Sequence, residues 1–109
     1  ISPTGGNYPG SVIPVTFKYS SSSGHSIWVN SNATEHLAEY AKSISRTLTP
    51  EKVRLGSQLR IKSLGSAIDT ATRNGVPLNT PMKFGGWQLE FRQSVGDELP
   101  VLIHAFFEG

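Results

Sequence analysis

The stretch Ser26–Tyr40 joins an apolar strand to a helix, and this junction fixes the order of the elements around it. Ser26–Asn30 has the apolar character of a short strand. Asn32 is a favourable helix N-cap residue, and Glu35 stands three positions later, where a capping box places its acidic side chain. A helix is therefore expected over about Ala33–Leu48. Its apolar residues recur with the helical period and should face a core: Leu37, Ala41, Ile44 and Leu48.

A hairpin is expected before this helix and a second helix after it. Val12–Tyr19 alternates as a strand does, and the short polar turn that follows predicts antiparallel pairing with Ser26–Asn30. Thr49-Pro50-Glu51 provides a cap, a proline and an acid in the positions where helices begin. The second helix should reach about Arg73, although Gln58–Leu64 also alternates and leaves a strand there as the alternative.

Two strands are expected near the end of the chain. Trp87–Gln93 alternates, and Pro100–Phe107 is apolar on both faces, which is typical of a central strand. The alternation places His104 on one face of that last strand, flanked by Leu102 and Phe106. The order of strands and helices indicates an α+β fold, with an N-terminal hairpin and helices packed on a twisted antiparallel β-sheet.

The 109 residues suffice for one domain with a modest core. Residues 1–10 contain two prolines and three glycines and are interpreted as a linker or flexible arm, which leaves 11–109 as a single domain. The chain begins at Ile1 rather than at methionine, which suggests a fragment of a longer protein. No membrane segment is expected. The absence of cysteine excludes disulfides, thiolate metal sites and cysteine nucleophiles.

Positive charge is concentrated in one part of the sequence, although the formal net charge is only +2. Positions 42 to 62 contain a single acid, Glu51. Such a segment is suited to bind a phosphate backbone, and an ordinary solvated helical face is the alternative interpretation. The basic residues of this segment are Lys42, Arg46, Lys52, Arg54, Arg60 and Lys62.

Histidine exchanges protons near neutral pH, so His25, His36 and His104 are the first candidates for chemistry. Metal-independent RNA cleavage needs a base, an acid and a cation that stabilises the charged phosphorane. His36 and His104 suit the acid–base pair. Further groups suited to such a site are Arg92, Arg46, Arg60 and Lys62 for charge, Glu90 as an orienting carboxylate or a base, and Tyr40 and Trp87 for base stacking.

These residues also have structural interpretations. His104 lies among apolar residues and could be a core histidine, and Trp87 could equally belong to the core. Arg92 and Glu90 could form an ordinary exposed pair. His25 lies in a serine-rich turn and is expected at the surface. No metal-ligand spacing and no glycine-rich phosphate loop is present, so no metal and no cofactor is expected.

Three segments carry a resemblance to a known family: Ile27–Tyr40, Gly85–Phe91 and Leu99–Glu108. Together they resemble the C-terminal toxin domains of bacterial polymorphic toxins, which include contact-dependent growth inhibition effectors. The resemblance implies the end of an exported surface protein that is delivered into the cytoplasm of a neighbouring bacterium. It also implies a cognate immunity protein, usually acidic, and leaves open a requirement for a host activating factor.

Many small basic members of this family are ribonucleases that cleave tRNA, and several have a barnase/EndoU/colicin/RelE-type fold. The resemblance assigns catalysis to His36 and His104, with Glu35, Tyr40 and Trp87 as further members of the site. The hairpin expected before the helices departs from the family pattern. A non-catalytic module that binds nucleic acid or protein, and a toxin of different chemistry, remain the alternatives.

Overall fold

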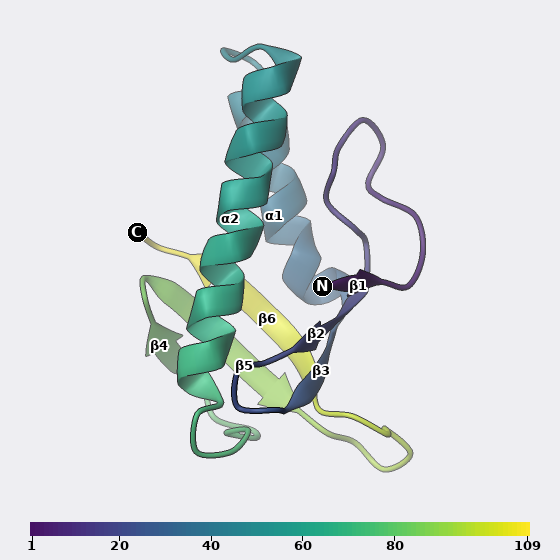
Figure 1. Ribbon diagram of the computed structural model, residues 1–109, viewed down its shortest axis with the longest axis vertical. Helices are drawn as coiled ribbons and strands as arrows, with labels where there is room; N and C mark the ends of the chain where they lie inside the picture. The colour runs from purple at the N-terminus through teal and green to yellow at the C-terminus, as the bar shows by residue number, and fades with distance from the viewer.

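Two helices and a six-stranded sheet make up this computed structural model, which describes residues 1–109 (Figure 1). The strands lie in the order β1-β2-β3-β6-β5-β4, and only the pair β3–β6 is parallel. The α+β fold predicted from the sequence is confirmed, with one parallel pair in an otherwise antiparallel sheet. In chain order the elements are β1 (Ser2–Pro3), β2 (Phe17–Ser20), β3 (Ser26–Val29), α1 (Ser31–Ile44), α2 (Pro50–Ala71), β4 (Met82–Phe84), β5 (Trp87–Arg92) and β6 (Val101–Phe107).

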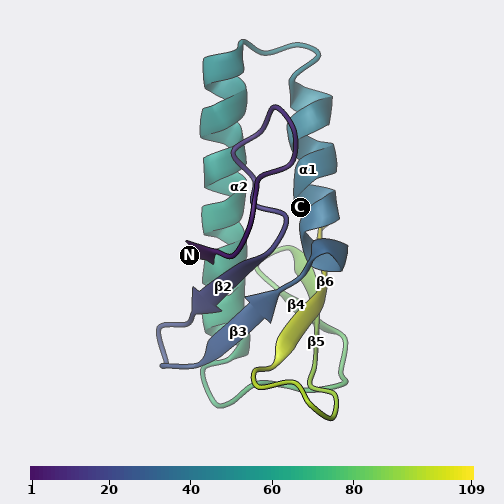
Figure 2. The same cartoon turned by 90° about the vertical axis from the view of Figure 1, so that its right-hand side faces the viewer.

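Residues 1–10 are attached to the domain, contrary to the predicted linker or flexible arm. β1 pairs with β2 at the edge of the sheet, and Asn7 forms an isolated bridge with Pro14. The hydroxyl of Tyr8 lies 2.8 Å from that of Thr34 on α1. Prolines and glycines in this segment therefore shape a loop that returns to the helices: it runs in front of them in Figure 2, and Gly10 and Ser11 line hollows together with residues of both helices.

The N-terminal hairpin forms as predicted, although its first strand is shorter than expected. β2 and β3 pair from Phe17–Val29 to Ser20–Ser26. The strand begins at Phe17 rather than Val12, because Pro14 and its neighbours belong to the returning loop. Phe17 and Val29 are fully buried, which fixes the register of the hairpin on the core.

The first helix begins earlier than the sequence predicted. Asn30, not Asn32, is the N-cap: its side-chain oxygen accepts a hydrogen bond from the backbone N–H of Asn32 at 3.1 Å. The proposed capping box of Asn32 and Glu35 is therefore wrong, because Asn32 already lies inside the helix. Of the expected core face, Leu37 and Ala41 are buried, whereas Leu48 lies beyond the helix end and is 40% exposed.

The second helix begins at the predicted point. Thr49 accepts a hydrogen bond from the backbone N–H of Lys52 at 3.3 Å, and Pro50 occupies the first turn. The alternative strand over 58–64 is excluded. α1 and α2 lie side by side and extend beyond the sheet (Figures 1 and 2), and Leu55 and Leu59 in the first half of α2 are 51% and 66% exposed. Neither helix combines the length and the apolar character needed to span a membrane.

Gly85 and Gly86 make the tight turn that connects β4 to β5. Their φ angles are +57° and +83°, and Phe84 pairs with Trp87 on either side of them. Two consecutive residues with positive φ match the right-handed twist of a hairpin, which is why glycine is favoured here. The core lies between the sheet and the helix pair, and its largest side chains include Trp87, Phe17 and Phe91.

Candidate active site

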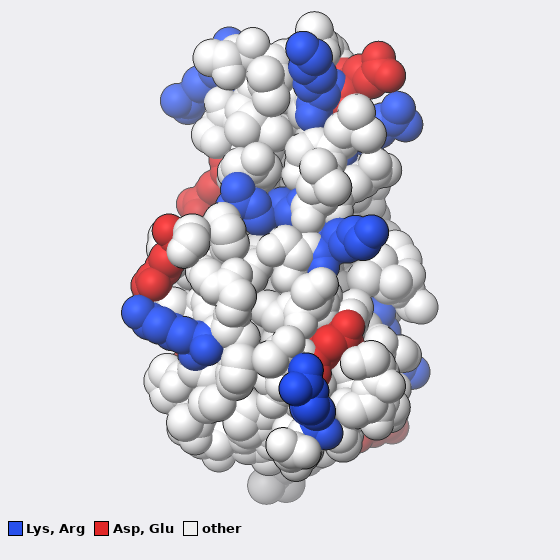
Figure 3. All heavy atoms as spheres, turned by 60° about the vertical axis from the view of Figure 1, so that its left-hand side comes forward, with Lys and Arg blue, Asp and Glu red and all other residues white.

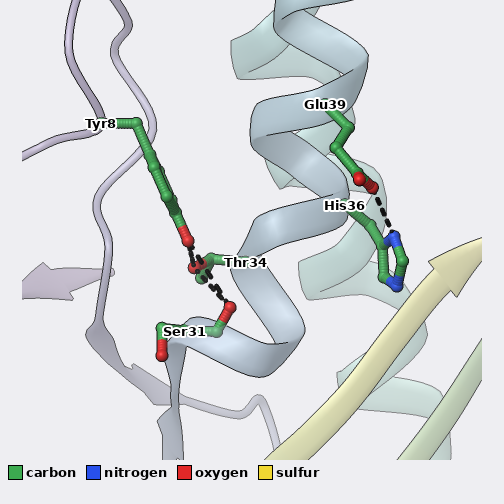
Figure 4. A network of polar contacts seen from close by, with 5 residues as sticks. All are labelled: Tyr8, Ser31, Thr34, His36 and Glu39. Carbon is green, nitrogen blue, oxygen red and sulfur yellow. Dashed lines mark hydrogen bonds and ion pairs between the residues drawn. The ribbon is translucent and has the colours of Figure 1, made fainter.

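His36 lies on the first turns of α1, and the N-terminal segment anchors that part of the helix from the other side (Figure 4). The buried hydroxyl of Thr34 donates to the carbonyl of Val15 at 2.7 Å, so the hydroxyl of Tyr8 is the donor in its 2.8 Å contact with Thr34. Side chains two residues apart on a helix, such as Thr34 and His36, are separated by about 200° around its axis. Because Thr34 points into this anchor, His36 points to the opposite side, toward β6.

A β-bulge turns His104 to the same side. Glu90 pairs with His104 and Phe91 pairs with Leu102, so Ile103 is an extra residue in β6. Leu102 is consequently buried in the core, whereas His104 and Phe106 lie on the outer face of the sheet with Glu90. The prediction that Leu102 and Phe106 flank His104 on one face is therefore wrong for Leu102. The interpretation of His104 as a core histidine is wrong as well, because its face is the one turned away from the core.

The packing of α1 beside β6 brings the two histidines together. β3 pairs with β6 at only two positions, and α1, which follows β3 directly, packs along the rest of β6. The ring centroids of His36 and His104 are 5.9 Å apart, with the planes at 82°. The ring of Phe106 lies 5.1 Å from that of His36. Both histidines are thus close enough to approach a single phosphodiester.

Each histidine has a polar partner that orients it. Nδ1 of His36 lies 2.7 Å from Oε1 of Glu39, one helical turn away. A carboxylate only accepts, so Nδ1 carries the proton in this contact, and Nε2 of His36 is left free. Nε2 of His104 lies 3.4 Å from the side-chain oxygen of Gln88. His36 retains 29% of its side-chain exposure, so its ring is supported yet accessible.

Acidic and basic side chains alternate around His104 on the outer face of the sheet. Arg92 contacts Glu90, with Nη2 at 3.1 Å from Oε2. Lys83 lies 3.2 Å from Glu108, which also accepts a hydrogen bond from Gln88. Lys83 and His104 line the same shallow hollow. Arg92 and Glu90 form the pair that the sequence left as their structural interpretation, and Glu90 is also the cross-strand partner of His104.

A second hollow opens on the other side of His36, between the two helices and the end of β6. It has a volume of about 320 Å³ and is lined by His36, Tyr40, Arg60 and Phe106, among others. We call it the His36 cleft. Tyr40 contributes the face of its ring to the cleft, because the guanidinium carbon of Arg60 lies 3.7 Å from its centroid. The structure thus brings Tyr40 and Arg60 to the same hollow as His36.

Other predicted members lie elsewhere. Glu35 is exposed and has no hydrogen bond or ion pair, so the carboxylate beside His36 is that of Glu39 instead. Trp87 is 1% exposed, and its indole N–H donates to Ser63 at 3.0 Å, so the predicted stacking of a base on this ring is wrong. Trp87 belongs to the core and forms the floor of the His36 cleft.

The basic segment 42–62 does not form one surface. Lys42 lines a different hollow, next to the N-terminal segment, and Arg46 lies in the turn beyond the end of α1, ten positions after His36. Lys62 is about 200° around α2 from Arg60 and so points away from the cleft. Figure 3 shows Lys and Arg side chains dispersed over one face of the molecule rather than gathered together. Among the predicted phosphate-binding residues, only Arg60 reaches the cleft.

Sequence reasoning missed Glu39, Gln88, Lys83 and Phe106. Glu39 could have been found, because residues three apart on a helix are neighbours and Glu35 is only one position from His36. Gln88 and Lys83 depend on strand register and could not. No group of three or more His, Cys, Asp or Glu side chains is arranged to hold a metal ion.

Comparison with known protein-family models gives no match, and comparison with curated proteins gives none either.

Proposed function

We propose that this domain is a metal-independent endoribonuclease that uses His36 and His104 as its acid–base pair. The observation that supports the proposal is the 5.9 Å separation of the two rings, from residues 68 positions apart in the sequence, on an accessible face. Histidine pairs suit this reaction because one ring can accept a proton while the other donates one near neutral pH.

In the proposed reaction, the base removes the proton from a ribose 2′-hydroxyl, and the 2′-oxygen attacks the adjacent phosphorus. The bond from phosphorus to the 5′-oxygen breaks, and the acid delivers a proton to that oxygen. The products are a 2′,3′-cyclic phosphate and a free 5′-hydroxyl, so no water or redox partner is consumed. The cationic side chains beside the histidines stabilise the negative charge of the phosphorane.

The contact between Glu39 and His36 supports His36 as the base. Glu39 accepts the proton of Nδ1, so the free Nε2 has the lone pair that takes a proton from the 2′-hydroxyl. The carboxylate also stabilises the imidazolium that results. His104 is then the acid, in its protonated form, with Arg92 and Lys83 nearby as sources of positive charge.

The biological setting follows from the resemblance to polymorphic toxin domains. It favours tRNA as the substrate and delivery to the cytoplasm of a competing bacterium. An acidic immunity protein would neutralise the domain by binding over or near the histidine pair.

The test is incubation of the purified domain with total bacterial RNA, with and without EDTA. His36→Ala and His104→Ala should each lower the cleavage rate at least about 100-fold. His25→Ala is the matched control, because His25 lies in the β2–β3 turn, and it should cleave at the wild-type rate. Discrete tRNA fragments that end in a 2′,3′-cyclic phosphate and persist in EDTA are expected.

Two results would contradict the proposal. Full activity in either the His36→Ala or the His104→Ala variant would reject that histidine as part of the acid–base pair. Intact RNA, even after addition of bacterial extract to supply a host factor, would reject the nuclease itself. Salt-sensitive RNA binding without cleavage would then identify a non-catalytic nucleic-acid-binding module.

A further inference from the structure

The guanidinium of Arg60 lies over two aromatic rings at the His36 cleft. Its guanidinium carbon lies 3.7 Å from the ring centroid of Tyr40 on α1 and 4.3 Å from that of Phe107 on β6. Both contacts are cation–π contacts of the guanidinium with a ring face, and neither ring accepts a conventional hydrogen bond from its five N–H donors. The two rings therefore restrict the position of Arg60 without pairing its donors.

The edge of Arg60 has no protein partner. Arg60 forms no ion pair, and no carbonyl or carboxylate of the chain accepts a hydrogen bond from it. The one acidic side chain that lines the cleft, Glu39, is engaged with His36. A half-buried, oriented and unpaired guanidinium favours a bidentate anion, and phosphate matches its planar fork.

Arg60 lies on the other side of His36 from His104. His36 and Arg60 line one hollow, whereas His104 lines another hollow together with Lys83. The ring of Tyr40 lies under Arg60. Tyr40 is one helical turn from His36, and such neighbours have Cβ atoms about 5–6 Å apart. An anion on Arg60 would thus lie beside the histidine pair but would not be the group that both histidines contact.

We propose that Arg60 forms a phosphate subsite, which binds the phosphate next to the scissile one in an RNA strand. The identity of the substrate rests on the proposed ribonuclease function, whereas the affinity for a phosphate does not. The subsite makes the preferred substrate an oligonucleotide with a phosphate on the Arg60 side of the cleaved bond. A dinucleoside monophosphate, which has only the scissile phosphate, leaves Arg60 unoccupied.

Binding is tested first, with a fluorescent 2′-deoxy-oligonucleotide that lacks the attacking hydroxyl and cannot be cleaved. Arg60→Lys keeps the charge and removes the planar fork, so it should weaken binding about tenfold at fixed salt. Arg46→Lys is the matched control, because Arg46 lies in the turn after α1 and lines neither hollow beside the histidines, and it should change affinity by no more than about twofold. Equal affinity of wild type and Arg60→Lys would overturn the subsite.

Kinetics then locate the phosphate along the strand. A dinucleoside monophosphate is compared with the same compound carrying an extra 5′- or 3′-terminal phosphate. One of the two phosphates should lower KM about tenfold in the wild type, with kcat little changed, and Arg60→Lys should abolish this gain. An equal gain in wild type and variant would overturn the proposal.

Folding controls and the separation of the two proposals complete the test. Thermal unfolding shows whether Arg60→Lys is folded, and Tyr40→Leu disrupts the stack by a second route and should weaken oligonucleotide binding as well. A domain that cleaves nothing but binds the oligonucleotide through Arg60 would reject the nuclease and retain the subsite. RNA cleavage at equal KM and kcat in wild type and Arg60→Lys would reject the subsite and retain the nuclease.

Discussion

Glu39 is the residue whose position most changes the interpretation of His36. The sequence suggested Glu35 as the carboxylate of the site, yet on a helix Glu35 is about 100° around the axis from His36, whereas Glu39 is one turn above it. The observed 2.7 Å contact follows from this spacing. Glu39 is a positioning residue, since it acts on the substrate only through His36.

Glu39→Gln should therefore lower kcat about tenfold and leave KM nearly unchanged. This loss is smaller than the loss expected when a histidine of the acid–base pair is removed. The amide can present its NH₂ group to Nδ1 and so favour the wrong tautomer. The measurement is steady-state cleavage of a short RNA. Glu35→Gln is the control, because it removes the same charge one position from His36. Equal losses in both variants would show a general effect of charge.

At the scale of elements, α2 contains two glycines, and only Gly65 is required for the close approach of α2 to β2. A Cβ on Gly65 would lie 2.9 Å from the hydroxyl of Tyr19 on β2, which is fixed by hydrogen bonds to Gly65 and Asp69 at 3.0 Å each. A Cβ on Gly56 would meet the terminal methyl of Ile44 at 3.0 Å, and such a methyl can move.

Gly65→Ala should consequently lower the free energy of unfolding by about 1–3 kcal/mol, despite the better helix propensity of alanine. Gly56→Ala should leave it unchanged or raise it by up to about 1 kcal/mol. Urea unfolding followed by circular dichroism measures both. A stabilised Gly65→Ala variant would mean that β2 does not approach α2 as closely as described.

Tyr19 also makes the docking of β2 on α2 dependent on pH. Burial, and then the hydrogen bond to Asp69 and its negative charge, raise the pKa of Tyr19 from 10.0 to about 12. Because the folded state favours the protonated hydroxyl, the stability that this group contributes is complete below pH 10. It is lost as the pH rises through about 12, when the phenolate forms in the folded protein as well.

The corresponding experiment is a series of urea unfolding midpoints for wild type and Tyr19→Phe between pH 8 and pH 12. Near pH 8 the variant should be less stable by about 1 kcal/mol, since it lacks the hydroxyl whose one proton is shared between the carbonyl of Gly65 and the carboxylate of Asp69. The difference should shrink between pH 10 and 12, because only the wild type loses this contribution there. A constant difference over the whole range would argue against the linkage.

Local signals in the sequence predicted the elements well, and long-range pairing explains what they missed. Thr49 and Pro50 mark a helix start within their own few residues, so α2 could be placed. The cap at Asn30 was missed because Asn32 suits the same role, and the end of β3 decides between them. The bulge at Ile103 depends on the register of β5 against β6, so alternation alone placed Leu102 on the wrong face. His36 and His104 could be nominated by their chemistry, but their meeting required the parallel pairing of β3 with β6.

The whole molecule separates two sets of cations that the sequence did not distinguish. Lys83 and Arg92 lie on the sheet face with His104, whereas Arg46 lies in the turn after α1 and Lys62 lies on α2, and neither lines a hollow with a histidine. If RNA lies across the sheet face, the position of a charge should matter more than the total. The double variant Lys83→Gln/Arg92→Gln should raise KM for RNA about tenfold at physiological salt. The double variant Arg46→Gln/Lys62→Gln changes the net charge equally and should raise KM no more than about twofold. The slope of log affinity against log salt should decrease by about 0.7 for each phosphate that the variant no longer neutralises, and only in the first variant. Equal effects would place the RNA across the helices instead, and would restore the single basic segment that the sequence suggested.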